Sequence, residues 1–426
     1  MPGSPADRFA RLGALATNPR TRVAYLLTVH PAVSQTFIVD EIEALREVGV
    51  DVTPISINPP AAHDVSNAAQ QRVRDTTFYI KSQSRISVAL ALVATAVRHP
   101  SVLLLPLRAG GFDVKAYVWR YFQLAEAVVA FRECRRLGIR HVHAHFGQAP
   151  STIAWMTSGV GLICEGEPWS WSATIHGWHE FVNERAALLR EKVGAARFIA
   201  CVSDYTRSQL MRLSRPQDWS KVHVVRCGID PELIGFRATA PLAERPVVVQ
   251  VARLAPEKGH LVLLDAVDLL RHRGVDVQLR LIGPSEGDFG DLVRARIDDL
   301  GLADAVELTG PCDPQQVREH LAVADVFCLP TFAEGLPVAI MEAMAAGVAV
   351  VTTYISGIPE LAVDGETARV VPAARADLLA DALQMVIEDD AARERMVAAA
   401  RERILRQHVL RHNITELRDL FAAATS

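Results

Sequence analysis

Two glutamates, Glu334 and Glu342, stand eight positions apart in the segment TFAEGLPVAIMEAMAAG. Pro337 favours the first turn of a helix, where its missing N–H costs nothing, and Gly347 favours the end of that helix. The free N–H groups at the start of such a helix, which Gly335 lets a ligand approach closely, predict a phosphate site. At ~1.5 Å per residue the two carboxylates are on the order of 12 Å apart, comparable to a sugar diphosphate between its sugar ring and its ribose. The segment therefore predicts a carboxylate at each end of the site that accepts hydrogen bonds from hydroxyl groups of the ligand.

The alternative is that both glutamates are ordinary solvent-exposed acids, which is how most glutamates occur. Small apolar residues surround Glu342 and predict that most of its helix is buried. A buried carboxylate without hydrogen-bond partners costs several kcal/mol. A polar ligand would supply those partners, so we favour the ligand site.

Two cations follow a predicted strand in the segment PVVVQVARLAPEKGHLVLLDAVDLL. The pattern predicts a buried strand over 247–251, a loop that carries Arg253 and Lys258, and a helix opened by Gly259. In an open parallel sheet, ligands bind beyond the carboxyl ends of the strands, so both cations are expected to face the phosphate site. A surface pair on a loop is the alternative for either residue taken singly, and it weakens because both stand at one strand end.

Segments along nearly the whole chain resemble, in order and spacing, the nucleotide-sugar-dependent retaining glycosyltransferases of family 4, which are group 1 glycosyl transferases with the GT-B fold. They are YLLTVHPAVSQTFIVDEIEAL, HVHAHFG, ATIHGWHEF, ACVSDYTRSQL, VVRCGIDP, VQVARLAPEKG, LIGPSEGDFGDL, VELTGPCDPQQV, ADVFCLPT, AEGLPVAIMEAMAAGVAVVTT and SGIPELAVDG. The opening segment and HAHFG are most similar to members of exopolysaccharide or colanic-acid-type biosynthesis and of other cell-envelope glycan pathways.

The resemblance implies a role for each matching residue. Arg253 and Lys258 would lie on the diphosphate, where they offset the charge that grows as the leaving group departs. Glu342 would bind the ribose hydroxyls. Glu334 would hold the transferred sugar and the distal phosphate, and His176, in ATIHGW, would bond the sugar next to the reacting carbon. Without the resemblance, a lone histidine after a strand is more often structural than catalytic.

Further donor-binding positions are implied by the same resemblance: Gly335, Leu336, Pro337, Ser203 in CVSDYT, and Gly283 in LIGPSEG. The first loop, TVHPAVSQTF, lacks the paired glycines of many relatives. A similar subgroup has Ser, Glu or Gln, Thr and Phe there, so we expect Ser34, Gln35 and Thr36 to replace the glycine contacts. LIGPSEG also departs from the commoner Gly-x-Gly-Pro form, which leaves the nucleotide base open.

Three histidines alternate in HVHAHF, which places His141, His143 and His145 on one face of a strand and suggests a metal site. We reject that interpretation because no further ligand stands nearby and the string resembles a metal-free strand of the family. The chain has no Asp-any-Asp motif to bridge a metal to a diphosphate. We therefore predict neither a metal nor a cofactor, with cations and a helix terminus holding the diphosphate.

Strand-like and helix-like segments alternate along the 426 residues, half of them hydrophobic, which predicts an α/β protein with parallel sheets. We predict two doubly wound Rossmann-like domains facing each other across a cleft: 1–237 on the acceptor side and 238–407 on the donor side. The polar, proline-bearing segment RATAPLAER is the expected hinge. Residues 408–426 form an amphipathic helix, which the resemblance implies returns to the first domain.

The first domain is basic, with 27 Lys and Arg against 20 Asp and Glu in residues 1–237, whereas the rest has 18 against 29. Residues 85–112 mix apolar runs with arginines. Two interpretations are equally good: an interfacial helix near a lipid-linked acceptor, and a buried core helix. Nucleic acid is excluded because no basic motif with interleaved aromatics is present. Six cysteines without close pairs and an N-terminus without a signal-peptide core indicate a cytoplasmic protein, peripheral on the inner membrane face in the first interpretation.

These observations predict retaining transfer of a glycosyl group from a UDP- or GDP-sugar to a glycan or polyprenyl-linked acceptor. Two alternatives stay open. A nucleotide-sugar epimerase or a phosphorylase shares the two-domain fold, and a catalytically silent subunit of a glycan-synthesis complex would bind the donor without turnover. The presence of Arg253, Lys258, Glu334 and Glu342 together favours the transferase over both.

Overall fold

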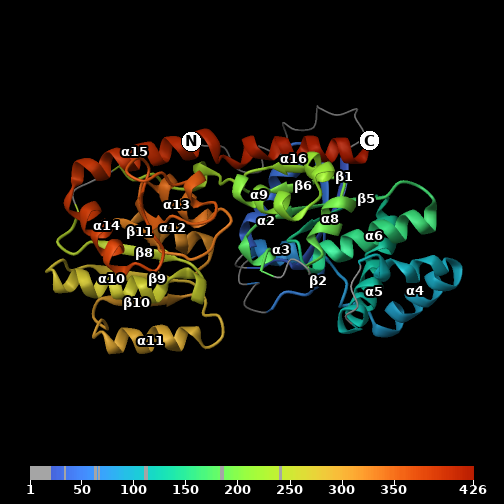
Figure 1. Cartoon of the computed structure of the whole chain (residues 1–426), viewed down its shortest axis with the longest axis horizontal. Helices are drawn as coiled ribbons and strands as arrows, with labels where there is room; N and C mark the ends of the chain where they lie inside the picture. The colour runs from blue at the N-terminus through green and yellow to red at the C-terminus, as the bar shows by residue number, and fades with distance from the viewer. Residues whose placement is uncertain are drawn as a thin grey trace.

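The computed structural model describes residues 21–32, 35–61, 65, 68–109, 114–182, 187–238 and 242–426. Ser34 of the predicted first loop and residues 239–241 of the predicted hinge lie outside these ranges. Figure 1 shows two α/β halves side by side, with the C-terminal helices running across both. The described residues thus include both predicted domains.

Seven strands of the described N-terminal half form one all-parallel sheet in the order β3-β2-β1-β4-β5-β6-β7. The register is continuous across the centre, where Ala24 lies beside Val142 and Ala144 beside Ala173. The strands are β1 (Thr21–Val29), β2 (Val50–Asn58), β3 (Phe78–Tyr79), β4 (His141–His145), β5 (Ser170–Ile175), β6 (Ile199–Cys201) and β7 (Val222–Val224).

Helices connect these parallel strands along the chain. They are α2 (Thr36–Glu47), α3 (Ala68–Asp75), α4 (Arg85–Arg98), η3 (Pro100–Ala109), α5 (Val114–Leu137), α6 (Ala149–Glu165), η4 (Trp178–Glu180), α8 (Leu189–Ala195), α9 (Asp204–Leu213), η5 (Pro216–Lys221) and η6 (Pro231–Leu233).

The C-terminal half repeats this plan with a six-stranded parallel sheet in the order β10-β9-β8-β11-β12-β13 among the described residues. Its strands are β8 (Val247–Val251), β9 (Gln278–Ile282), β10 (Val306–Gly310), β11 (Val326–Leu329), β12 (Ala349–Thr353) and β13 (Arg369–Val371). Its helices are η7 (Pro256–Lys258), α10 (His260–His272), α11 (Phe289–Asp299), α12 (Pro314–Ala322), α13 (Val338–Ala346), η8 (Ile358–Glu360), α14 (Ala376–Glu388) and α15 (Asp390–Gln407).

Alternation along the central strands divides each half into two apolar layers. In β1, Ala24 and Leu26 join the cluster formed with α5 and α6, whereas Val23, Tyr25 and Leu27 join the cluster formed with α2. This is the period of two that a strand buried on both faces requires. The same division in the second sheet confirms the predicted α/β class with two doubly wound domains.

The last helix, α16 (Leu410–Thr425), leaves the second half and packs on the first. Ile414, Leu417 and Phe421 are buried against α2 and β1, in the same layer as Tyr25. Figure 1 shows α15 over one half and α16 over the other. The predicted return of the C-terminal helix to the first domain is confirmed, although it begins at Leu410 and follows a second long helix.

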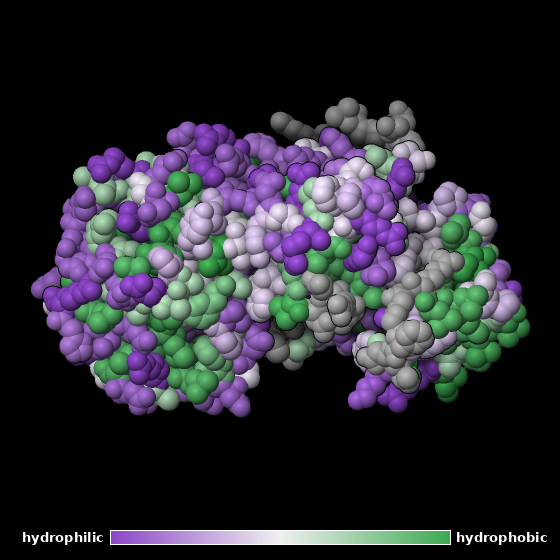
Figure 2. All heavy atoms as spheres, viewed as in Figure 1, coloured by the Kyte–Doolittle hydropathy of each residue, from purple (hydrophilic) through white to green (hydrophobic). Residues whose placement is uncertain are grey.

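The segment expected to be either interfacial or core has an exposed apolar face. In α4 only Ala91 is fully buried, while Ile86, Leu90, Val93 and Val97 are 74, 63, 58 and 78% exposed. Figure 2 shows hydrophobic residues gathered at this end of the molecule, at the right of the view. The interpretation as a buried core helix is therefore wrong for α4, whereas Val102 and Leu105 of η3 are buried in the core. Residues 110–112 of the predicted segment lie outside the described residues.

No single helix in the described part of the chain is long and apolar enough to cross a membrane. The pair α4 and η3 reaches the required length and composition only together, and it is bent by 106°.

Candidate active site

Two adjoining pockets lie between the halves, at the carboxyl ends of both sheets. The first, which we call pocket A, is lined by the last residues of three strands of the second sheet: Val251, Ile282 and Leu329. The second, pocket B, lies where chain segments leave β4, β5 and β6 of the first sheet. The two pockets share five residues: Arg253, Lys258, Glu334, Pro337 and Val338. A ligand can therefore extend from one pocket into the other.

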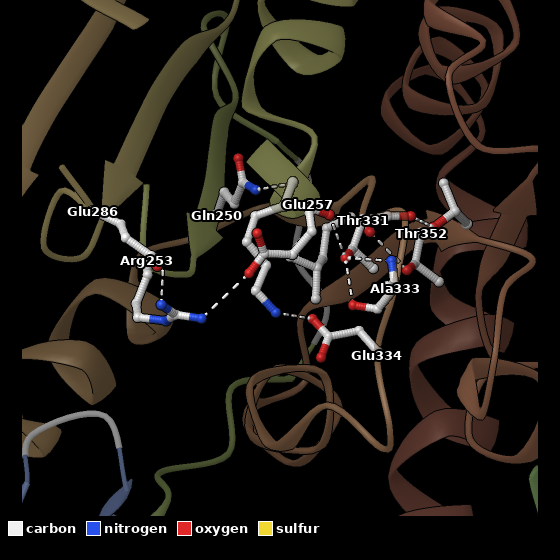
Figure 3. A network of polar contacts seen from close by, with 11 residues as sticks. Gln250, Arg253, Glu257, Glu286, Thr331, Ala333, Glu334 and Thr352 are labelled. Carbon is white, nitrogen blue, oxygen red and sulfur yellow. Dashed lines mark hydrogen bonds and ion pairs between the residues drawn. The ribbon is translucent and has the colours of Figure 1, made fainter. Parts of the chain in front are cut away.

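The two predicted cations lie at the junction of the pockets, and each is paired with a carboxylate. Nζ of Lys258 donates to Oε1 of Glu334 at 2.6 Å, and both side chains are only 14% exposed. Arg253 contacts Glu286 and, at 3.3 Å between Nη2 and Oε1, Glu257. Figure 3 shows Arg253 between these two carboxylates. An incoming diphosphate would replace carboxylate oxygens on both cations.

The predicted short helix is present as α13 and ends at Gly347, whose φ of 82° suits glycine. It begins at Val338, so Pro337 is the residue before the first turn rather than within it. No side chain caps its first N–H groups, and Pro337 and Val338 line both pockets. The start of α13 therefore offers free N–H groups to an anion beside Lys258.

Gly335 and Leu336 line pocket B, and Gly335 is also where the two halves touch. A Cβ at Gly335 would lie 1.6 Å from the carbonyl oxygen of His176, so only glycine fits this contact. Gly283, which lines pocket A, has a φ of 145°, and a Cβ there would lie 2.1 Å from the carbonyl oxygen of Ala252. Close backbone approach thus explains both glycines.

Glu342 lines pocket A, one and a half turns into α13. Burial raises the pKa of Glu342 to about 7, Arg318 opposes that shift, and Asp40 from the other half adds to it. The pKa of Asp40 is itself raised to about 6, first by burial and then by Glu43. Most of α13 is buried as expected, whereas Glu342 itself is half-buried at the wall of pocket A, where a hydroxyl-bearing ligand would satisfy its carboxylate.

His176 follows β5 and lines pocket B, so the structure brings it to the same pocket as Lys258 and Glu334. Its Nε2 lies 2.8 Å from Nδ1 of His145. Phe37 and Phe146 flank the ring, with centroids 5.0 and 4.8 Å away. Burial lowers the pKa of His176 well below its usual value, so the imidazole is neutral.

Two of the three alternating histidines of β4, His141 and His143, bond hydroxyl groups of β5, whereas His145 bonds His176. His141 contacts Ser170 and Ser172, both at 2.7 Å, and His143 contacts Ser172 at 2.7 Å and Thr174 at 2.9 Å. Both ring nitrogens of each histidine are thus occupied by hydroxyl groups. This pairing gives the HVHAH string a structural role between two buried strands.

A buried carboxylate and a buried ammonium hold the backbone around pocket B. Glu180 accepts from the N–H groups of His176 at 2.7 Å and Gly177 at 2.9 Å, and from Gly147. Nζ of Lys192 donates to the carbonyls of Gly147 at 2.6 Å and Gln148 at 2.9 Å. Burial brings the pKa of Glu180 up to about 7 and that of Lys192 down to about 7. Together they tie the loop after β4 to the loop after β5.

The remaining predicted residues differ in position. Gln35 lines pocket B and Thr36 lines pocket A, both at the start of α2. Ser203 is buried, and its Oγ accepts from the N–H of Thr206 at 3.1 Å as the N-cap of α9. It lines neither pocket, although a Cβ at Gly357 would lie 3.1 Å from its Oγ. Its role at the phosphates stays a prediction.

Sequence reasoning missed several residues that line pocket B or adjoin pocket A. Trp178, His179 and Glu257 belong to the motifs GWHEF and PEKG that were already singled out, so their neighbourhood was a usable signal. Asp40 and Arg318, which influence Glu342, lie on α2 and α12. Asp40 stands in the first quoted segment, but nothing in the sequence indicated that it lies near Glu342. Their position depends on how the two halves meet.

Residues 236–403 match the family described as "Glycosyl transferases group 1". The chain is 25% identical over 428 residues to the amylovoran biosynthesis glycosyltransferase AmsK of Erwinia amylovora, with 94% of this chain and all of that one covered. It is 27% identical over 379 residues to the putative colanic acid biosynthesis glycosyltransferase WcaL of Escherichia coli K12, with 85 and 89% covered.

Among solved structures, the Anabaena protein Alr3699/HepE, crystallised in complex with UDP and glucose, superimposes with a TM-score of 0.73. The alignment covers 94% of this chain and 99% of that one at 14% identity, so it speaks for the fold. Two parallel sheets with a returning C-terminal helix are the GT-B arrangement. Residues 236–403 are therefore a group 1 glycosyl transferase domain, and the chain is a glycosyltransferase with the GT-B fold.

Proposed function

We propose that the protein is a retaining glycosyltransferase of family 4 that moves a sugar from a UDP- or GDP-sugar to a glycan or lipid-linked acceptor. The observation that carries this proposal is the junction of the two pockets. There Arg253, Lys258 and the uncapped start of α13 converge, with Glu342 on one side and His176 on the other. This order matches the parts of a nucleoside diphosphate sugar, with ribose in pocket A and sugar in pocket B.

The charges at the junction fit a departing diphosphate. As the bond between the sugar carbon and the diphosphate oxygen breaks, negative charge grows on that oxygen. Lys258 and Arg253 would stabilise it together with the N–H groups of α13, in a site already arranged before the reaction. The acceptor hydroxyl would attack the sugar carbon from the side of the leaving group, so the configuration of that carbon would be retained. The proton of the hydroxyl would pass to the diphosphate oxygen.

We further propose that the reaction needs no metal or other cofactor. Two cationic side chains and a helix terminus offer positive charge at the place where some transferases use a divalent ion. In the described residues no group of three or more His, Cys, Asp or Glu side chains is arranged to hold a metal ion. Binding with and without magnesium tests this part directly.

The names of the relatives support an acceptor in exopolysaccharide or cell-envelope assembly, because amylovoran and colanic acid are the products named for two of them. The complex of the Anabaena protein with UDP and glucose supports a nucleotide-sugar donor. The base is tested with both UDP and GDP.

A contact with an anionic lipid surface at the inner membrane face is part of the same proposal. The face of α4 formed by Ile86, Leu90, Val93 and Val97 is exposed, and Arg85 and Arg98 at the helix ends are exposed as well. An apolar stripe with basic ends is the arrangement of helices that lie in a membrane interface. Such a contact would bring a lipid-linked acceptor to the cleft from the side of the first domain.

The first experiment is a thermal-shift titration with UDP, GDP and their common sugar conjugates, with and without magnesium. A ligand at ~100 times its dissociation constant adds roughly 2.7 kcal/mol to the free energy of unfolding. We expect a magnesium-independent shift with one of the nucleotides.

Turnover with that donor then separates the alternatives. Release of nucleoside diphosphate that requires an acceptor identifies a transferase. Sugar isomerisation without an acceptor would identify an epimerase, and binding without any turnover would identify a silent subunit.

A further inference from the structure

The chemistry of His176 depends on which of its ring nitrogens carries the proton. Nε2 is taken by Nδ1 of His145, 2.8 Å away, so Nδ1 is the nitrogen left for a ligand in pocket B. In a neutral imidazole one nitrogen donates and the other accepts. The residue that fixes the proton at one end therefore decides whether His176 donates to the ligand or accepts from it.

Glu41 of α2 stands at the far end of this pair. Its Oε1 lies 3.2 Å from Nε2 of His145, an ion-pair distance without the alignment of a full hydrogen bond. The same Oε1 accepts from the hydroxyl of Tyr25 at 2.7 Å, which holds the carboxylate in place. The side chain of His145 is fully buried and that of Glu41 is 14% exposed, so water screens the contact little.

These contacts define a direction for the protons. A carboxylate oxygen that accepts from Tyr25 favours a second donor at 3.2 Å over a nitrogen lone pair, so the contact favours the N–H on Nε2 of His145. With the ring proton of His145 on Nε2, its Nδ1 is an acceptor. The proton between the two rings then comes from Nε2 of His176, which leaves Nδ1 of His176 as the lone pair available to a ligand.

Neighbouring groups do not interrupt this chain. Both nitrogens of His143 are occupied by Ser172 and Thr174. Glu180 contacts the backbone N–H of His176 and not its ring. Phe37 and Phe146 pack against the ring of His176 and hinder its reorientation.

We propose that Glu41 and His145 are positioning residues that fix His176 as the Nε2–H tautomer, so that Nδ1 accepts a hydrogen bond from a sugar hydroxyl in pocket B. The identity of the ligand rests on the proposed function, whereas the tautomer is a property of the protein alone. Neither positioning residue lines pocket B, so their influence on a ligand there passes through His176.

The test is imidazole ¹⁵N NMR of the full chain with labelled histidine, with the His176 signals assigned by their loss in His176→Asn. We expect the wild type to show a proton on Nε2 and an acceptor-type Nδ1. In Glu41→Gln the side-chain amide can donate to His145, so we expect proton occupancy to appear on Nδ1 of His176. Glu47→Gln, an exposed glutamate on the same helix, is the matched control and should leave the signals unchanged.

Kinetics give a second readout. We expect Glu41→Gln to lower kcat roughly 10–100-fold with little change in the KM of the donor, as for other residues that orient a reacting group from behind. His145→Asn, whose amide oxygen can replace Nδ1, should retain more activity than His145→Leu at equal thermal stability.

A wild-type signal with the proton on Nδ1 of His176 overturns the proposal, whether or not any variant folds. An unchanged tautomer in folded Glu41→Gln overturns the role of Glu41. If no donor supports turnover but the tautomer behaves as expected, the proposed function fails and the positioning pair stands.

Discussion

Lys258 and Glu334 form the most enclosed ion pair at the junction of the two pockets, since both side chains are only 14% exposed. In the proposed function, each would need a different partner when a donor binds. The flexible side chain of Lys258 can move its ammonium from the carboxylate of Glu334 to a bound phosphate. It would then stay close to the negative charge that develops during the reaction. In the proposed function, the pair thus keeps the lysine paired until a diphosphate binds beside it.

We expect Lys258→Ala to lose roughly 2–4 kcal/mol of transition-state stabilisation, because a charge-stabilising group at the departing diphosphate is removed. The measurement is kcat/KM with the donor found by thermal shift. Lys81→Ala, whose ammonium pairs with Glu126 far from the pockets, is the control and should be near normal. Near-normal turnover of Lys258→Ala would remove the residue from the site.

Glu342 predicts a pH dependence of donor binding. With a pKa of about 7 in the protein without ligand, Glu342 is half protonated at pH 7. The carboxylate can accept from two ribose hydroxyls with both oxygens, whereas the protonated form uses one oxygen as a donor. Donor affinity should therefore rise as the pH increases through about 7. Calorimetry with the intact sugar nucleotide measures this, since its diphosphate does not titrate in that range. Glu342→Gln should bind more weakly and without this dependence.

The free energy of unfolding of the protein without ligand has the opposite pH dependence. Because the pKa of Glu342 in the folded protein lies above its usual value of 4.5, its contribution to stability is present below that value and lost as the pH rises through about 7. If the wild type and Glu342→Gln, both without ligand, show the same dependence of the free energy of unfolding on pH between 4.5 and about 7, the raised pKa is contradicted. Burial of Glu342 thus lowers the free energy of unfolding near neutral pH, and in the proposed function the ribose hydroxyls would offset that loss.

At this scale, the sequence predicted the residues that stand in short motifs next to a strand or helix end. Arg253, Lys258 and Glu334 were found in this way. Asp40 was not, because its effect on Glu342 depends on the contact between two halves that no local pattern encodes. Ser203 shows the reverse case, since its motif was recognised but its hydroxyl caps a helix.

Among the elements, β8 and the start of α10 were predicted to within a residue, because glycine and apolar periodicity mark their ends. For α13 the end at Gly347 was predicted, whereas its start, expected before Pro337, lies at Val338. The helix α4 was left undecided between interface and core. Its apolar residues at spacings of four, three and four define one face, but periodicity alone does not say whether protein or lipid covers it.

The exposed face of α4 leads to a test of membrane contact. We expect Leu90→Ser with Val97→Ser to reduce binding to vesicles containing anionic lipid by at least about tenfold, since apolar side chains are removed from the interface. Thermal stability should change little because both residues are exposed. Flotation with vesicles measures the binding.

The control for this pair is Leu292→Ser with Val323→Ser, two exposed apolar residues of the second half. Vesicle binding equal in both double variants, or none by the wild type, would show that the α4 face does not contact lipid.

At the scale of the whole molecule, the halves meet where Gly335 touches the carbonyl of His176. We expect Gly335→Ala to open the cleft, because its Cβ would lie 1.6 Å from that oxygen. Small-angle scattering should show a larger radius of gyration, and turnover should fall more than about tenfold, as a misplacement near 1 Å costs up to 10²-fold.

Gly235→Ala is the matched control, since a Cβ there meets nothing within 4 Å. An unchanged scattering profile together with normal turnover in Gly335→Ala would show that the halves do not need this contact. The pairing of the halves could not be predicted from the sequence beyond the fold resemblance, and the exact boundary at residue 237 stays a prediction.

The return of α16 to the first half reverses the order in which the two halves can be completed. Ile414, Leu417 and Phe421 fill the layer between α2 and β1, so the half that leaves the ribosome first lacks part of its core until the last residues are made. The second half is contiguous from β8 to α15 and can close its own core earlier. A chain released before residue 410 would therefore carry a finished second half and an open apolar layer around Tyr25 in the first, the state in which a nascent chain most needs a chaperone.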